Sequence, residues 1–368
     1  MLLPDPWLLF VFNLCAGLAL GHLLFRADYC MAGMFRDIFL FRNYTLLRSL
    51  SALISVTMVL FFLINTLNPA QLYPPPNLSY ASYATALGGV MFGVGMVLAG
   101  GCTVGTLYKM GGGSPASAVA FLGIMIGSIL YAGYHPFWES IRANTVIVKI
   151  RFLGDLSPAF GMIAVAFLAA ASMVAVLRWI KQGKWNVTAH AEGYLQPWKA
   201  AVGIALVSAA VYFFSGWPMG ITTAYAKVGA YMKNYFLPGR VSELAYFNQD
   251  HITAVASGVV VSGGAGPRVD IISYTELALM IGIVAGAFLT AVVLREFRVR
   301  GLPPKRQLAS AFVGGALVGF GARIASGCNL KFVLGALPLL SIQGLVFVAA
   351  MVAGAYFGAK LLKRFVIV

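Results

Sequence analysis

Three of the four cysteines stand where the surrounding residues could support chemistry. Cys102 and Cys328 follow glycine in the strings AGGCTVG and ASGCNLK, and Cys30 stands in RADYCMAGMFRD. A thiol is a weak, soft hydrogen-bond donor that stays mostly neutral at pH 7. Such a group suits a soft sulfur-bearing anion that must be held weakly enough to leave. Cys15 lies in the unbroken apolar run FVFNLCAGLAL and is interpreted as a small buried hydrophobic residue.

The two Gly-Cys strings are copies of each other. They share the pattern G-G-x-x-x-G-x-G-x-x-x-A-x-G-C at a constant offset of 226 residues. An internal repeat of opposite topology is typical of secondary transporters, whose broken helices meet near the bilayer midplane. The matching positions are Gly88, Gly89, Gly93, Gly95, Ala99, Gly101 and Cys102 with Gly314, Gly315, Gly319, Gly321, Ala325, Gly327 and Cys328.

A helix interrupted inside a membrane must present its unpaired backbone groups to protein or to a polar pathway. We expect a new half helix to begin near Thr103 and near Asn329, with free N–H groups and the positive end of its dipole favouring an anion. Arg323 lies within the second broken segment, where an isolated charge usually has a role. Lys109 and Lys331 follow the two cysteines, and for Lys109 anion attraction and snorkelling both remain open. The candidate substrate-binding residues are Cys30, Cys102, Cys328, Gly101, Gly327, Thr103, Asn329 and Arg323.

The elements that position these residues are membrane spans. Of the 368 residues, 60% are apolar and 10% charged, and the mean hydropathy is +0.85, which excludes a water-soluble globule. Two spans, near 84–110 and 307–337, contain the Gly-Cys interruptions. The seven continuous apolar spans lie near 7–25, 46–67, 116–135, 158–178, 199–215, 273–294 and 343–362.

Loop charges predict the orientation. The 26 Lys and Arg outnumber the 11 Asp and Glu, and they gather in segments 26–48, 178–199, 295–306 and the C-terminal tail. Placing these segments in the cytoplasm gives about nine crossings, an outside N-terminus and a cytoplasmic C-terminus. This distribution is typical of membrane topology, and no nucleic-acid partner is expected.

These observations predict an all-α integral membrane protein built as an inverted-repeat bundle. The first repeat covers 1–180, a cytoplasmic linker covers 181–196, and the second repeat covers 197–368. The segment around Cys30 is too polar to cross and is expected to re-enter the membrane. The corresponding segment of the second half, SGWPMGIT, has no cysteine, so the symmetry fails there.

The motifs LAGGCTVGTLYKMGGG, GFGARIASGCNLKFVLGALPLLS, RADYCMAGMFRD and SGWPMGIT together resemble the YeeE/YedE family of bacterial inner-membrane proteins. The resemblance implies an hourglass-like channel or transporter that passes thiosulfate between three cysteines without covalent capture, here Cys30, Cys102 and Cys328. It also implies a cytoplasmic partner, a TusA-like sulfur carrier or a rhodanese. The sequence departs from many relatives at Lys331, where they have glycine.

The resulting hypothesis is uptake of thiosulfate or a similar small anion, by a protein that is not an enzyme and needs no cofactor or metal. Two alternatives remain open: transport of a selenium compound, and a membrane thiol protein that transfers sulfane sulfur covalently. The methionines do not cluster around the cysteines as a copper pathway would require. The absence of a P-loop from the sequence makes direct ATP coupling unexpected.

Overall fold

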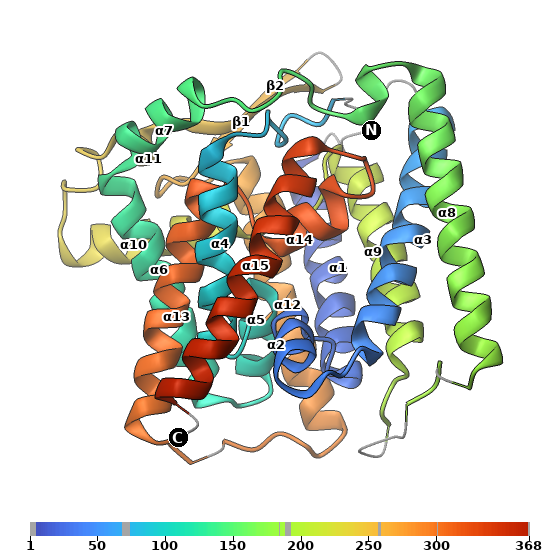
Figure 1. Cartoon of the computed structure of the whole chain (residues 1–368). Helices are drawn as coiled ribbons and strands as arrows, with labels where there is room; N and C mark the ends of the chain where they lie inside the picture. Colours follow the sequence, from blue (N-terminus) through green and yellow to red (C-terminus); the bar gives the residue numbers. More distant parts are fainter. Residues whose placement is uncertain are drawn as a thin grey trace.

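The protein is an all-α integral membrane protein, seen here in a computed structural model (Figure 1). Within the described residues, nine helices are long and apolar enough to cross a membrane, and they coincide with the nine predicted spans. The structure describes residues 5–67, 74–183, 185–187, 193–256, 259–299 and 301–366.

The described residues of the first half of the chain form eight α-helices. Local caps fix where several begin: Ser82 and Thr85 form a capping box before α4, and Ser114 caps α6 with proline at the first helical position. The helices are α1 (Pro6–Ala27), α2 (Met31–Phe41), α3 (Thr45–Leu67), α4 (Tyr83–Leu98), α5 (Thr103–Gly111), α6 (Pro115–Gly133), α7 (His135–Asn144) and α8 (Pro158–Lys181), with the short η1 (Leu153–Asp155) before α8.

The second half adds the remaining helices and one antiparallel hairpin. The hairpin, α7 and α11 lie at the end of the bundle that carries the N-terminus, whereas the C-terminus lies at the opposite end (Figure 1). The elements are α9 (Pro197–Ser215), α10 (Thr222–Phe236), α11 (Ala245–Asn248), β1 (Asp250–Ala256), β2 (Val259–Gly264), the π-helical η2 (Ser273–Leu277), α12 (Ala278–Val293), α13 (Lys305–Ile324), α14 (Asn329–Lys331), the π-helical η3 (Phe332–Ala336) and α15 (Ile342–Phe365).

The glycines of the repeated motif bring α4 and α13 into backbone contact. A Cβ added at Gly88 would lie 2.6 Å from the carbonyl oxygen of Gly321, and one added at Gly95 would lie 2.7 Å from that of Gly314. Around this crossing α4 packs against α15 and α13 packs against α6. The glycines therefore act in packing, because only a hydrogen side chain lets the helix backbones approach this closely.

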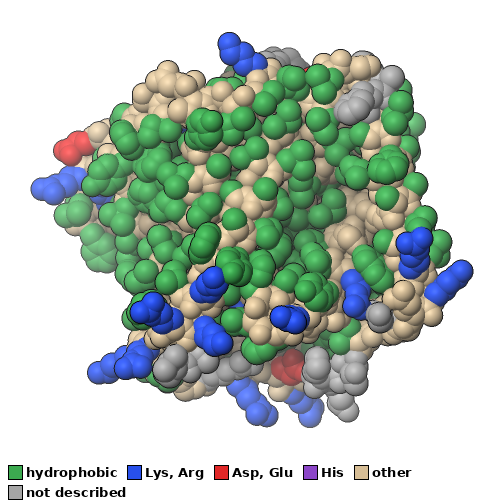
Figure 2. All heavy atoms as spheres, in the orientation of Figure 1, with side chains coloured by type: hydrophobic (Ala, Val, Ile, Leu, Met, Phe, Trp, Pro, Cys, Tyr) green, Lys and Arg blue, Asp and Glu red, His purple; other side chains and the backbone are tan. Residues whose placement is uncertain are grey.

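The outer surface of the bundle matches a lipid environment. Figure 2 shows a broad belt of apolar side chains, with Lys and Arg gathered mainly toward the end that carries the C-terminus. The most hydrophobic window of α8 has no buried residue, so this helix lies at the periphery against α3. Such a surface is stable only when lipid covers it.

Two predictions about the first helices have different outcomes. The interpretation of Cys15 as buried is wrong, because the side chain is exposed while neighbouring Ala16 and Gly17 face the core. Each residue turns about 100° around a helix, so adjacent positions face different surroundings. The 11-residue α2 spans about 16 Å, too short to cross a bilayer core of about 30 Å. This length agrees with the predicted re-entrant segment.

Candidate functional site

Each of the three candidate cysteines occupies the same structural position, the N-cap of a short helix. Cys30 precedes α2, Cys102 precedes α5, and Cys328 precedes α14, which continues into η3. Their exposed fractions are 4%, 2% and 0%. N-caps are usually Ser, Thr, Asp or Asn, whose oxygen satisfies the first helical N–H groups strongly. A thiol does so weakly, which leaves these groups able to interact with an anion.

The two helix interruptions are built in the same way. Gly100 and Ser326, which correspond in the repeat, both have left-handed backbone conformations, with φ of 69° and 63°. Lys109 Nζ donates to the Gly100 carbonyl at 2.8 Å, and Lys331 Nζ donates to the Ser326 carbonyl at 2.6 Å. Both lysines therefore bind the interruptions themselves, a role that neither snorkelling nor anion attraction had predicted.

The thiols of Cys30 and Cys102 come together over Gly105. They interact directly, and a Cβ added at Gly105 would lie 3.0 Å from Cys30 Sγ and 3.4 Å from Cys102 Sγ. The Gly105 N–H donates to Cys102 Sγ at 3.3 Å. Asn329 reaches Cys102 from the other interruption and donates from Nδ2 to Met31 Sδ at 3.1 Å. The sulfur atoms of Cys30, Met31 and Cys102 and the side-chain amide of Asn329 thus come together from three segments of the chain.

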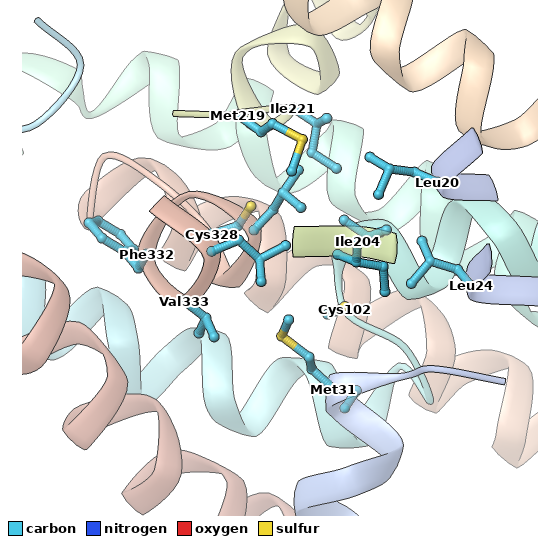
Figure 3. Close-up of a cluster of buried hydrophobic side chains, with 14 of the residues drawn as sticks. Leu20, Leu24, Met31, Cys102, Ile204, Met219, Ile221, Cys328, Phe332 and Val333 are labelled. Atoms are coloured by element: carbon cyan, nitrogen blue, oxygen red, sulfur yellow. The ribbon is translucent and has the colours of Figure 1, made fainter. Parts of the chain in front are cut away.

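Cys328 lies beside Thr103, the first residue of α5. Its thiol approaches the Thr103 hydroxyl, yet Thr103 Oγ1 has no hydrogen bond of good geometry among the described residues. Tyr225 holds this turn by donating its hydroxyl to the Thr103 carbonyl at 2.8 Å. Buried apolar side chains, including Ile204 and Met31, pack around Cys328 and Cys102 (Figure 3).

The centre of the molecule is closed. A cavity of about 20 Å³, lined by Cys102, Gly105, Met31 and Asn329, lies at this point. That space is close to the minimum for a single water molecule, so no oxyanion fits there without side-chain movement.

A vestibule opens on each side of this constriction. The vestibule toward the N-terminal end of the bundle, named the outer vestibule for that position, has a volume of about 300 Å³, and its lining includes Arg142, Arg323 and Lys331. The vestibule toward the C-terminal end, named the inner vestibule, has a volume of about 850 Å³, and its lining includes Arg36 and Lys109. Acidic side chains line both spaces as well, namely Asp28 and Glu296 in the inner vestibule and Glu139, Asp250 and Glu276 in the outer one. The two spaces flank one narrow segment that contains Cys102 and Met31, which gives the site an hourglass profile.

Arg323 lies in the outer vestibule, separate from the thiols. Its Nη1 donates to the Tyr246 hydroxyl at 2.9 Å and to Thr223 Oγ1 at 3.5 Å, while Nε is buried without a partner in the described part of the chain. Gly101 and Gly327 shape the two turns: an added Cβ would lie 3.1 Å from the Thr106 nitrogen and 2.6 Å from Lys331 Cδ respectively. Of the predicted residues, the three cysteines, Thr103 and Asn329 thus lie at the centre, Arg323 lies in the outer vestibule, and the two glycines shape the turns.

Sequence reasoning missed two residues of this centre. Gly105 provides the space between the thiols, and its repeat partner is Lys331, the position already noted as departing from many relatives. The difference between Gly105 and Lys331 was the signal in the sequence that could have identified Gly105. At this position one copy of the repeat leaves space, whereas the other inserts a long side chain. Met31 gave no such signal, since methionine next to a cysteine is ordinary in an apolar segment.

The family described as Sulphur transport matches residues 26–357. The chain belongs to this family. The match confirms the resemblance to YeeE/YedE proteins and makes the chain a membrane transporter of sulfur compounds, not an enzyme.

Several named transporters are similar in sequence to this sulphur transport protein. The thiosulfate transporter TsuA of Escherichia coli is 28% identical over 94% of this chain and 92% of its own length. TsuA of Spirochaeta thermophila is 26% identical over 90% of this chain and 92% of its own length. The probable transporter YedE of Escherichia coli is 28% identical over 45% of this chain and 40% of its own length. The similarity to the two TsuA proteins thus extends through both Gly-Cys motifs.

Proposed function

We propose that this protein takes up thiosulfate through the bacterial inner membrane into the cytoplasm, passing it along Cys328, Cys102 and Cys30. The observation that carries this proposal is the placement of three buried thiols, each at a helix N-cap, between two vestibules that each contain Arg and Lys side chains. The names of the two TsuA relatives support thiosulfate as the anion.

The chemistry of the narrow segment supports passage without a covalent bond. Lys331 on the outer side and Lys109 on the inner side attract the anion, and the N-terminal amides of the short helices contribute partial positive charge. Between them the thiols donate only weak hydrogen bonds to the soft sulfur of thiosulfate. Weak contacts in series let the anion leave each position. Met31 has a flexible side chain that can move as the 20 Å³ cavity widens.

The proposal includes the inverted repeat, 1–180 and 197–368, joined by a cytoplasmic linker at 181–196. The helix packing supports it, because equivalent contacts recur in the two halves. The contact of α4 with α15 corresponds to that of α13 with α6, and the contact of α1 with α12 corresponds to that of α9 with α3. Residues 184 and 188–192 of the linker lie outside the described residues. The gathering of Lys and Arg toward the C-terminal end supports an outside N-terminus and a cytoplasmic C-terminus (Figure 2).

A cytoplasmic acceptor completes the proposal. A TusA-like sulfur carrier or a rhodanese at the inner vestibule would consume thiosulfate as it emerges and so keep net flow inward. The volume of about 850 Å³ and the lining residues Arg36 and Lys109 support a vestibule able to hold the anion before transfer.

The test is thiosulfate-dependent growth and labelled thiosulfate uptake by cells carrying single Cys→Ala variants. Cys30→Ala, Cys102→Ala and Cys328→Ala are expected to lower uptake at equal membrane levels, because each removes one weak binding position. Cys15→Ala is the matched control, since its side chain is exposed on the helix surface. Equal behaviour of all four variants would overturn the three-thiol assignment.

A further inference from the structure

A carboxylate occupies the helix N-terminus that corresponds to the Cys30 site in the other half of the chain. Segment α10 corresponds to α2, but its N-cap is Ile221, which supplies no side-chain cap. Glu276 Oε2 instead accepts the N–H groups of Thr223 at 2.8 Å and Ala224 at 3.2 Å. The Glu276 side chain comes from η2, more than 50 residues later in the chain. An internal anion therefore fills a position built to receive one.

The surrounding backbone leaves room for this carboxylate. A Cβ added at Gly220 would lie 2.6 Å from Glu276 Oε1, so glycine at this place in SGWPMGIT gives the carboxylate its space. Glu276 projects from a π-helical turn, a geometry found frequently at functional sites. Glu276 is 7% exposed and lines the outer vestibule, so its carboxylate lies where an incoming anion would pass.

The same vestibule contains a guanidinium that Glu276 attracts electrostatically without a hydrogen bond among the described residues. Arg323 is 5% exposed, its Nε is unpartnered within the described ranges, and its side-chain hydrogen bonds there go to Tyr246 and Thr223. Arg142 Nη2 donates to the carbonyls of Arg323 and Ile324, each at 3.2 Å, which fixes the end of α13. An anion entering here would find a free guanidinium N–H beside amides already taken by Glu276.

We propose that Glu276 is a displaceable internal anion of the outer vestibule, released from the α10 amides when the transported anion binds beside Arg323. This inference rests on the proposed transport function and adds a gate to it. Because the arriving negative charge disfavours a second one nearby, binding of the anion favours protonation of the displaced carboxylate. Because the coupling between anion binding and protonation is reciprocal, protonation of Glu276 at lower pH must strengthen anion binding by the same free energy.

Other titratable groups surround Glu276 and define the controls. Burial and the nearby Arg323 guanidinium lower the pKa of His251 from 6.5 to about 3, so His251 does not titrate between pH 5.5 and 8. The helices α1 and α12, which also pack around η2, carry only His22 and Arg26, both near the opposite end of the bundle. The other titratable or charged groups on this side are Arg323, Lys331, Lys227 with its partner Asp270, Cys328, Arg142, His135, Glu139, Asp250, Tyr131 and Tyr246.

The experiment measures thiosulfate and sulfate binding to the purified full-length protein by calorimetry, at pH 5.5 and 8 and in buffers of different ionisation enthalpy. For the wild type we expect tighter binding at pH 5.5 with uptake of protons. For Glu276→Gln we expect binding at pH 8 to tighten by about tenfold, within the usual range of coupling between sites, and to lose its pH dependence. Gly220→Ala, which crowds the carboxylate, should shift affinity in the same direction.

Glu139→Gln is the matched control, because it removes a negative charge from the exposed rim of the same vestibule. We expect its affinity to change less than about twofold. Weaker or unchanged binding by Glu276→Gln, or a wild type that binds anion without proton uptake, would overturn the inference. Equal affinity of the wild type for sulfate and thiosulfate would contradict the proposed function, while the Glu276→Gln effect on sulfate would still support the gate.

Discussion

A methyl group placed at Gly105 should block transport without destabilising the protein. The added Cβ would lie 3.0 Å from Cys30 Sγ and 3.4 Å from Cys102 Sγ, so the first thiol must move by a few tenths of an ångström. Gly105 lies within α5, where alanine is favoured over glycine by about 0.5–1 kcal/mol. This gain opposes the cost of crowding, and the Gly105 N–H that donates to Cys102 is retained.

The functional effect should be large, because the methyl group occupies the space between two thiols at the narrowest part of the pathway. An added barrier of about 1.4 kcal/mol suffices to slow passage about tenfold. Labelled thiosulfate uptake by proteoliposomes and the thermal stability of the purified protein measure the two effects separately. Gly133→Ala is the control, since its Cβ meets nothing within 4 Å in the described structure. Uptake by Gly105→Ala within twofold of the control would refute the placement of the pathway between these sulfurs.

Three further predictions follow from packing and charge. Gly88→Ala should destabilise the fold by about 1–3 kcal/mol, because its Cβ would lie 2.6 Å from the Gly321 carbonyl oxygen, and an unchanged melting temperature would contradict this. Lys109→Met should cost about 1–3 kcal/mol by leaving the Gly100 carbonyl unpaired, measured by thermal unfolding; stability equal to wild type would show that water replaces the ammonium. The pKa of His251 is lowered to about 3, so the folded protein resists protonation there more than the unfolded chain does. The free energy of unfolding should therefore be highest above pH 6.5 and fall by about 2 kcal/mol by pH 5. His251→Phe should remove this part of the pH dependence, and a variant with the same pH profile as the wild type would contradict the prediction.

The membrane architecture could be predicted from the sequence because long apolar runs and basic loops are local signals. All nine predicted spans coincide with membrane-length helices in the described residues, and α5 and α14 begin at Thr103 and Asn329 as expected. The interruptions were visible because glycine and cysteine recur at the same spacing in both copies.

The sequence could not determine which side chains meet across long separations. The contact of Cys30 with Cys102 depends on how α2 folds back, and no spacing encodes that angle. Arg323 points into the outer vestibule because Tyr246, from the short helix α11, accepts its hydrogen bond. Cys15 was assigned to the wrong face because α1 is apolar on all sides, so hydrophobicity alone could not distinguish the core from lipid.

Glu276 shows the same limit at the position where the repeat breaks down. The missing cysteine in SGWPMGIT was visible, but its replacement comes from η2 and is revealed only by the bonds to Thr223 and Ala224. A broken symmetry in the sequence therefore marked the place without identifying the group that fills it.

The central claim is that thiosulfate crosses intact between thiols that remain unmodified. The most direct measurement uses proteoliposomes containing only this protein and thiosulfate carrying separate labels on its two sulfur atoms. The account predicts that both labels reach the lumen in equal amounts and that the protein keeps its unmodified mass. Arrival or retention of the outer sulfur alone, with sulfite left outside, would contradict it and establish covalent sulfur transfer instead.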